Sequence, residues 1–265
     1  MPEAAPPSTT DRSPSDRPII AFFDVDNTLM RGASAFHVGK GAFRKGMLGI
    51  RDVALFAWHD FRFVKVGENR QHLATVKERA MALLAGHSEA EVIALAQDIF
   101  DRTIAPRLWP ETVDLTREHL AKGHEVWLIS ATPQLVGQVI ADRLGLTGAL
   151  GTVLEAKAGR FTGEMIGNVV HAEEKAVVAE ALARERGASL ADCWAYSDST
   201  NDIPLLSLVG NRVVVNPDAR LERHARDHGW AIMPLKHSSI REAQRRVRKE
   251  ARAVKKSARR SKPVE

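Results

Sequence analysis

The sequence predicts an α/β protein in which a doubly wound, mostly parallel sheet carries an all-helical insertion. From about residue 105 to residue 235, short apolar runs alternate with stretches of helical periodicity, as in repeated strand–helix units. Polar residues follow directly after several of these runs, where open α/β sheets place their chemistry. Between residues 33 and 104, helical periodicity continues without a strand signal, which indicates the insertion.

The first strand is expected at about residues 19–23 and is followed by two acids. The run Ile-Ile-Ala-Phe-Phe is entirely apolar, as buried parallel strands are. Asp24 and Asp26 come directly after it, and Thr28 follows two residues later. Because unpaired buried charge is costly, these carboxylates indicate a site shared with a cation and a phosphate. An Asp-rich turn at the strand end is the alternative interpretation.

The insertion is expected to form helices near residues 53–64, 69–85 and 88–104. In the last of these, Ser88 precedes Glu91 by three residues, which is the spacing of a capping box. An all-helical insertion directly after the first strand is what a mobile cap over a strand-end site would look like. The alternative is a helical layer packed permanently on the sheet.

The strand–helix rhythm then resumes and brings further polar residues to strand ends. The expected elements are a helix from Pro110 to Ala121, a strand at 125–129 that ends at Ser130, a helix at 133–144 closed by Gly145, a β-hairpin at 152–166 that turns at Ala158-Gly159, a helix at 172–186, strands at 193–197 and 212–215, a helix starting at 216–218, and an edge strand at 230–233.

Composition limits the class of protein. The 265 residues are 44% hydrophobic and 27% charged, enough for one sizeable core. Cys193 is the single cysteine, which rules out an internal disulfide and favours a reducing compartment. Residues 1–17 are rich in Pro and Ser and lack an apolar signal segment, so we expect a disordered leader. We therefore expect a cytoplasmic, soluble protein.

The net charge of +5 is concentrated in the tail. Residues 241–265 carry a net +8, whereas the remainder carries −3. Small apolar residues recur every three or four positions from Ile240 onward, and Ser239 with Glu242 has capping-box spacing. The prediction is a basic amphipathic helix over 236–265, either solvated and docked by a thin Ala/Val stripe or in weak contact with an anionic membrane or nucleic acid.

Four of these signals together resemble the haloacid dehalogenase (HAD) superfamily of phosphohydrolases. In chain order the matching residues are Asp24-x-Asp26-x-Thr28, Ser130, Lys175, and Asp198 to Asp202, which correspond to motifs I to IV. The resemblance covers residues 19 to about 216. It implies a Rossmann-like core at 18–32 and 105–235, with an inserted C1-type helical cap at 33–104.

The resemblance also implies roles for the acids. Asp24 would be the nucleophile that forms an aspartyl-phosphate, and Asp26 the general acid and base. Mg²⁺ would be held by oxygen atoms of Asp24, Asp198, the Asp26 main-chain carbonyl and the neighbourhood of Asp202. The dehalogenase branch generally lacks the second acid, so Asp26 points to phosphate chemistry.

The remaining motif residues would position the phosphoryl group. Ser130 would donate a hydrogen bond to it, Lys175 would supply a fixed positive charge, and Asn201 would donate to the phosphate. Thr28 is expected to hold Asp26 in place. Asp202 is expected to orient Lys175 or a metal-bound water.

The helical cap directly after motif I resembles the phosphoserine-phosphatase-like branch, subfamily IB. True phosphoserine phosphatases carry a Glu shortly after motif I that pairs with the substrate ammonium, and Ala33 stands at that position here. We therefore expect a small phosphorylated metabolite other than phosphoserine as the preferred substrate. The alternatives are a phosphotransferase or phosphomutase with the same intermediate, and an anion-binding protein with a vestigial core.

Overall fold

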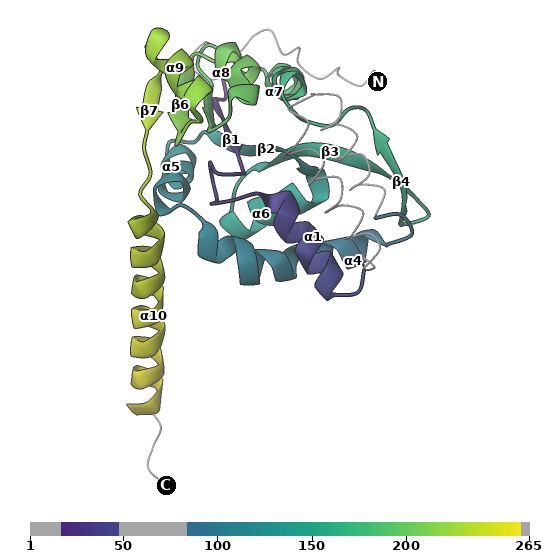
Figure 1. Ribbon diagram of the computed structural model, residues 1–265, viewed down its shortest axis with the longest axis vertical. Helices are drawn as coiled ribbons and strands as arrows, with labels where there is room; N and C mark the ends of the chain where they lie inside the picture. The colour runs from purple at the N-terminus through teal and green to yellow at the C-terminus, as the bar shows by residue number, and fades with distance from the viewer. Residues whose placement is uncertain (1–16, 48–83, 261–265) are drawn as a thin grey trace, which may run out of the picture.

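The computed structural model describes residues 17–47 and 84–260, and its centre is a seven-stranded sheet with the order β4-β3-β2-β1-β5-β6-β7 (Figure 1). The strands are β1 (Ile20–Asp24), β2 (Glu125–Pro133), β3 (Gly148–Lys157), β4 (Arg160–Ile166), β5 (Trp194–Ser197), β6 (Asn211–Val215) and β7 (Ala231–Met233). All neighbours pair in parallel except β3 and β4, which form the expected hairpin. The predicted α/β class is confirmed.

Strand β1 lies in the middle of the sheet and packs on both of its faces. Ala21 and Phe23 belong to one buried apolar cluster, and Ile20 and Phe22 belong to a second. This alternation follows from the two-residue period of a strand. It explains why the strand reads as one continuous apolar run, since helices cover the sheet on both sides.

The helices that flank the core begin and end close to the predicted positions. They are α5 (Pro110–Ala121), α6 (Gln134–Leu144), α7 (Glu173–Arg186) and α9 (Ala219–Asp227). A further short helix, α8 (Ile203–Leu208), was not predicted. Pro110 occupies the first turn of α5, where its missing N–H costs nothing. Gly145 ends α6 with φ of 69°, a left-handed conformation that glycine adopts without strain. Strand β2 is longer than expected, because it continues past Ser130 to Pro133 with a shift in register.

The described ends of the insertion pack against the core. They comprise α1 (Ser34–Arg44), α4 (Glu89–Ile99), the π-helical segment η2 (Phe100–Ile104) and the short 3₁₀ helix η3 (Ala105–Arg107). Ala42, Leu95 and Ile104 share an apolar cluster with Val126 and Leu128 of the sheet. The Ser88–Glu91 capping box is confirmed. The helices expected near 53–64 and 69–85 lie outside the described residues, apart from a turn at 84–86.

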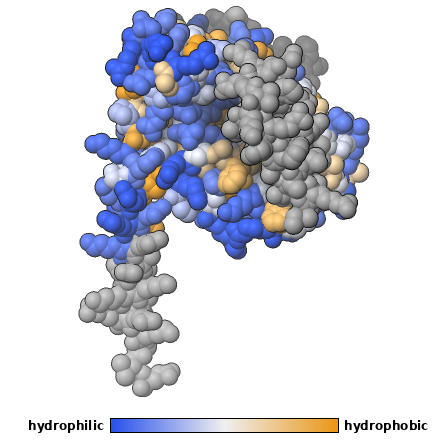
Figure 2. Space-filling model, in the orientation of Figure 1, coloured by the Kyte–Doolittle hydropathy of each residue, from blue (hydrophilic) through white to orange (hydrophobic). Residues whose placement is uncertain are grey.

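Helix α10 (His237–Arg260) leaves the body of the protein after its first turns (Figure 1). Ile240 is buried, whereas Val247 is 61% exposed. The predicted Ser239–Glu242 capping box is wrong, because the helix already begins at His237. The Ser239 hydroxyl bonds instead to the Lys236 carbonyl and the Glu111 carboxylate. The first turns of α10 are hydrophilic in Figure 2.

One sequence expectation is only partly covered by the described residues. The disordered leader expected at 1–17 falls outside them except for Arg17. Cys193 is buried and free. Among the described residues, no helix combines the length and the apolar character needed to cross a lipid bilayer.

Candidate active site

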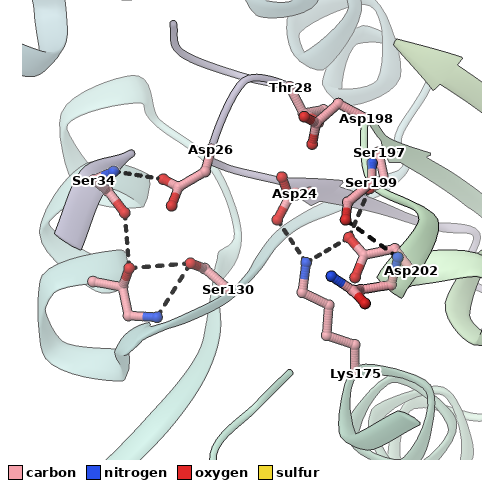
Figure 3. Close-up of polar contacts among 12 residues, drawn as sticks. Asp24, Asp26, Thr28, Ser34, Ser130, Lys175, Ser197, Asp198, Ser199 and Asp202 are labelled. Carbon is pink, nitrogen blue, oxygen red and sulfur yellow. Dashed lines mark hydrogen bonds and ion pairs between the residues drawn. The ribbon is translucent and has the colours of Figure 1, made fainter. Parts of the chain in front are cut away.

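The acids and the lysine predicted from the motifs converge at the carboxyl end of β1 (Figure 3). Asp24 is the last residue of β1 and is buried. Asp198 directly follows β5, which pairs with β1 in parallel, so both acids emerge at the same edge of the sheet. A strand end in the middle of an open α/β sheet is the usual location for chemistry in this class of fold.

Lys175 connects two of these acids. Its Nζ atom donates hydrogen bonds to Asp24 Oδ1 and Asp202 Oδ2, each at 2.6 Å. The Ser197 hydroxyl donates to the same Asp202 oxygen, also at 2.6 Å. All four side chains are buried. Of the two roles expected for Asp202, the structure therefore shows the orientation of Lys175.

The acids outnumber the cations at this position, and their pKa values reflect it. Burial raises the pKa of Asp24 to about 8, against the opposing effect of Lys175. Burial together with Asp202 raises the pKa of Asp198 to about 7. Burial alone would lower the pKa of Lys175, but Asp24 and Asp202 outweigh it and keep the ammonium charged. The cluster thus favours binding of further positive charge.

Thr28 and Asp26 are held differently from the sequence prediction. The Thr28 hydroxyl donates to Asp198 Oδ1 at 3.4 Å and does not hold Asp26. Asp26 Oδ1 instead accepts the Ser34 backbone N–H at 2.7 Å, at the beginning of α1. A carboxylate at a helix N-terminus satisfies one of the free N–H groups there. The start of the insertion therefore positions Asp26.

Ser130 belongs to a small group of buried hydroxyls. Its Oγ atom donates to Thr132 Oγ1 at 3.1 Å, and Thr132 Oγ1 lies 2.8 Å from Ser34 Oγ. Ser34, Thr132 and Ser197 are not among the site residues predicted from the sequence. Short polar residues directly after strands and at the start of a helix were the available signal, but these residue types are common in such positions.

Asn201 lies in the 3₁₀ turn Thr200–Asp202 after β5. Its backbone N–H donates to Ser199 Oγ at 3.2 Å, and Asp218 accepts the neighbouring Thr200 N–H at 2.7 Å. Asp218 also caps α9. The loop that carries Asp198, Asn201 and Asp202 is thus tied to the rest of the core.

The described residues contain no group of three or more His, Cys, Asp or Glu side chains arranged to hold a metal ion. All four acids expected near a metal accept hydrogen bonds: Asp26 from Ser34, Asp202 from Lys175 and Ser197, Asp24 from Lys175, and Asp198 from Thr28. Asp24 and Asp198 are the two side chains that the resemblance assigns most directly to the metal. Mg²⁺ commonly uses only one or two carboxylates and completes its shell with water and phosphate oxygens.

Comparison with known proteins identifies the family. The haloacid dehalogenase-like hydrolase family matches residues 21–207 of this chain. The chain belongs to this family. It is 46% identical over 234 residues to phosphoserine phosphatase SerB1 of Mycobacterium tuberculosis, covering 88% of this chain and 76% of that protein. It is 32% identical over 222 residues to a histidinol-phosphatase of Neisseria meningitidis serogroup C, covering 82% of this chain and 99% of that protein.

A solved structure supports the same fold. A Bordetella pertussis Tohama I protein of unknown function aligns with a TM-score of 0.73 and 30% identity, covering 82% of this chain and 98% of that one. The HAD motifs of the chain lie together at one buried to half-buried site, and both motif I acids are present. The chain is a HAD-family phosphatase.

Proposed function

We propose that this HAD phosphatase hydrolyses phosphate monoesters of a small metabolite through an aspartyl-phosphate on Asp24, with Mg²⁺ bound beside it. The single observation that carries the proposal is the buried contact of Lys175 with Asp24 at the carboxyl end of the central strand. A lysine fixed against a carboxylate nucleophile offers a positive charge where phosphoryl oxygens arrive. The motifs leave open whether water or an alcohol accepts the phosphoryl group, and water is the simpler acceptor.

Each residue has a defined part in the two half-reactions. An Asp24 oxygen attacks phosphorus and the bond to the ester oxygen breaks, while Lys175 and Ser130 hold phosphoryl oxygens. Asp26 gives a proton to the departing alkoxide. Asp26 then takes a proton from water as that water attacks phosphorus, and the bond to Asp24 breaks to release inorganic phosphate. Because Ser34 occupies Asp26 Oδ1, the proton would be carried by Oδ2.

The acidic cluster suits a magnesium ion. The side chains of Asp24 and Asp198 and the main-chain carbonyl of Asp26 would hold the ion. Asp202 would complete the proposed site by orienting a metal-bound water. A divalent cation there supplies charge that offsets the anionic ester as the nucleophile approaches. The raised pKa values of Asp24 and Asp198 support this proposal, since they arise from burial and neighbouring acids without enough positive charge.

The substrate is proposed to be a small phosphorylated metabolite other than phosphoserine. Ala33 precedes the first residue of α1 and is exposed, so no acid at this position meets a substrate ammonium. A panel of phosphate esters tests this proposal. It includes phosphoserine and histidinol phosphate, because relatives of the chain are named for these two compounds. The panel is completed by amine-free esters, and released phosphate is the measurement.

Asp24→Asn tests the proposed mechanism directly. The variant should lose activity by several orders of magnitude and remain folded, because the catalytic groups act as a unit. Acid-quenched wild-type protein should retain label from a ³²P-ester on the peptide containing Asp24. Asp114→Asn, an exposed acid paired with Arg117, is the matched control. Label on any other residue would contradict the mechanism, and turnover only with an added alcohol would favour the phosphotransferase alternative.

The division into cap and core is also proposed. Residues 33–104 would form the cap over the core at 18–32 and 105–235, in a cytoplasmic protein. Packing of α1 and α4 on the core cluster supports a firm attachment of the two ends of the insertion.

A second, minor proposal concerns the basic tail, which would contact anionic membrane or nucleic acid weakly. The projection of α10 from the body supports it, together with the charge of +8 over residues 241–265. Sedimentation with phosphatidylglycerol vesicles and gel shift with duplex DNA separate the two partners. Salt weakens binding to any anionic partner, so loss of either signal at high salt would not show that the tail is responsible. A chain truncated after residue 236, which lacks the basic helix, serves as the control.

A further inference from the structure

A row of three buried hydroxyls leads from the start of α1 to the phosphate side of the active site. Ser34 Oγ lies 2.8 Å from Thr132 Oγ1, and Ser130 Oγ donates to Thr132 Oγ1 at 3.1 Å. The Thr132 backbone N–H also donates to Ser130 Oγ, at 3.2 Å. Ser34 is completely inaccessible to solvent, and Thr132 and Ser130 are nearly so. Figure 3 shows Ser34 between Asp26 and this hydroxyl row.

The positions of the hydroxyl protons must change when a phosphoryl group binds. Each hydroxyl has one proton to donate and two lone pairs that accept. In the structure Ser130 uses its proton on Thr132, so it has none for a phosphoryl oxygen. When Ser130 turns its proton toward the phosphoryl group, its oxygen becomes free to accept from Thr132 Oγ1. Thr132 Oγ1 then accepts from Ser34, a direction that the 2.8 Å contact allows because either hydroxyl can be its donor.

We propose that Ser34 and Thr132 are positioning residues that form a hydroxyl relay with Ser130, in which phosphoryl binding reverses the direction of donation between Ser130 and Thr132. In the bound state Ser34 donates to Thr132, Thr132 to Ser130, and Ser130 to a phosphoryl oxygen. Hydrogen bonds in such a row strengthen one another, so the two outer hydroxyls make Ser130 a better donor. The relay rests on the proposed phosphatase function.

The surrounding backbone holds Thr132 where the relay needs it. Thr152 Oγ1 donates to the Ala131 carbonyl at 2.9 Å. Gly151 approaches so closely that a Cβ atom there would lie 2.6 Å from the Thr132 carbonyl oxygen. Thr132 therefore has little freedom to move toward another partner. At the other end of the row, the Ser34 N–H donates to Asp26, and the Ser34 hydroxyl contacts Thr132. One residue of α1 therefore contacts both Asp26 and the hydroxyl row that ends at Ser130.

The test uses p-nitrophenyl phosphate as substrate for the full chain and its variants. Thr132→Val keeps the shape of the side chain and removes its hydroxyl, and Ser34→Ala removes the outermost donor. Each should lower kcat about tenfold, roughly the value of one hydrogen bond. KM should change less, because donors to phosphoryl oxygens matter most as charge develops. Thr132→Ser restores the hydroxyl and should keep kcat close to the wild-type value.

Ser130→Ala separates the relay from a general structural role. In the Ser130→Ala background, Thr132→Val should cause no further loss of kcat, because Ser130 no longer donates to the phosphoryl group. The double variant should still be less thermally stable than Ser130→Ala alone. An equal loss of kcat in both backgrounds would overturn the relay, as would wild-type kcat in Thr132→Val. Absence of hydrolysis by the wild-type protein itself would instead refute the proposed function and the relay with it.

Discussion

Lys175 Nζ lies 2.6 Å from Asp24 Oδ1, although the two residues are 151 positions apart in the sequence. The ammonium extends from the first turn of α7 to the end of the central strand and is itself held by Asp202. Two buried acids share one cation at this point, so the charge balance of the site depends on Lys175. Loss of Lys175 would leave two buried acids without their cation.

Lys175→Met should therefore impair both properties. Activity should fall at least about a thousandfold, because the fixed charge for the phosphoryl group is lost. The free energy of unfolding should fall by about 3–5 kcal/mol if the acids stay charged, and by less if they take up protons. Kinetics and urea unfolding measure the two effects. Lys122→Met, at an exposed position, is the control, and activity within threefold of wild type would contradict the assigned role.

Asp198→Asn should weaken the response to Mg²⁺. The wild-type protein should be inactive in excess EDTA and should gain thermal stability when Mg²⁺ is added, since an ion that binds only the folded state stabilises it. The variant should need more Mg²⁺ for half-maximal activity and show a smaller shift in Tm. Asp192→Asn changes an exposed acid at the opposite, amino-terminal end of β5 and should respond as wild type does. Full turnover of the wild type in EDTA would exclude the metal requirement.

Ala33→Glu should shift preference toward phosphoserine. A charge pair is worth about 2–5 kcal/mol where it is buried, but Ala33 is exposed, so we expect about 1 kcal/mol, a several-fold change in preference. The measurement is kcat/KM for phosphoserine relative to 3-phosphooxypropionate, which has the same skeleton without the amine. Ala33→Gln matches the size without the charge. A tenfold preference for phosphoserine already present in the wild-type protein would show that the inference from Ala33 is wrong.

His119 should make the fold sensitive to acid. Its Nε2 lies 2.8 Å from the Tyr196 hydroxyl, and burial, together with His124 and Lys122, lowers the pKa of His119 to about 4. A histidine whose pKa is lower in the folded state contributes stability above its unfolded pKa of about 6.5 and loses it as the pH falls toward 4. The loss should be on the order of 3 kcal/mol over that interval.

His119→Gln removes this ionisation and provides the comparison. The variant should be less stable than wild type at pH 7, because the buried hydrogen bonds are altered, but the difference should shrink toward pH 4. Urea unfolding at pH 7.0, 5.5 and 4.5 measures it. An equal dependence on pH in both proteins would mean that other groups control acid unfolding.

The cap proposal predicts where hydrogen exchange should slow. Binding of BeF₃⁻, a mimic of the phosphoryl group, should protect the segments around Arg31-Gly32 and Ala105-Pro106, where the insertion joins the core. Lids over reactive intermediates close in this way. Strand β6 is away from both junctions, so its hydrogen exchange should not change on binding and serves as an internal reference. Unchanged protection at both junctions would favour the permanently packed helical layer.

The sequence by itself determined the α/β class, most element boundaries and the motif residues that meet at the site. These features depend on short-range patterns. An apolar run followed by Asp24 and Asp26 marks a strand end, and a proline at residue 110 or a glycine at residue 145 marks a helix end. Parallel strands bring their carboxyl ends to one edge, so the order of the motifs was enough to predict their convergence.

Only the tertiary structure decided which polar atoms contact one another. Thr28 lies two residues from Asp26 but bonds to Asp198, and Ser34 reaches Thr132 across 98 positions. The Ser239 capping box is wrong because the helix begins at His237, three residues earlier than a Ser239 cap requires, and the Ser239 hydroxyl bonds to Glu111 and Lys236 instead. Periodicity gives the face on which a residue lies, but a hydrogen bond requires two atoms within about 3 Å. That separation depends on how whole segments pack, which no local pattern contains.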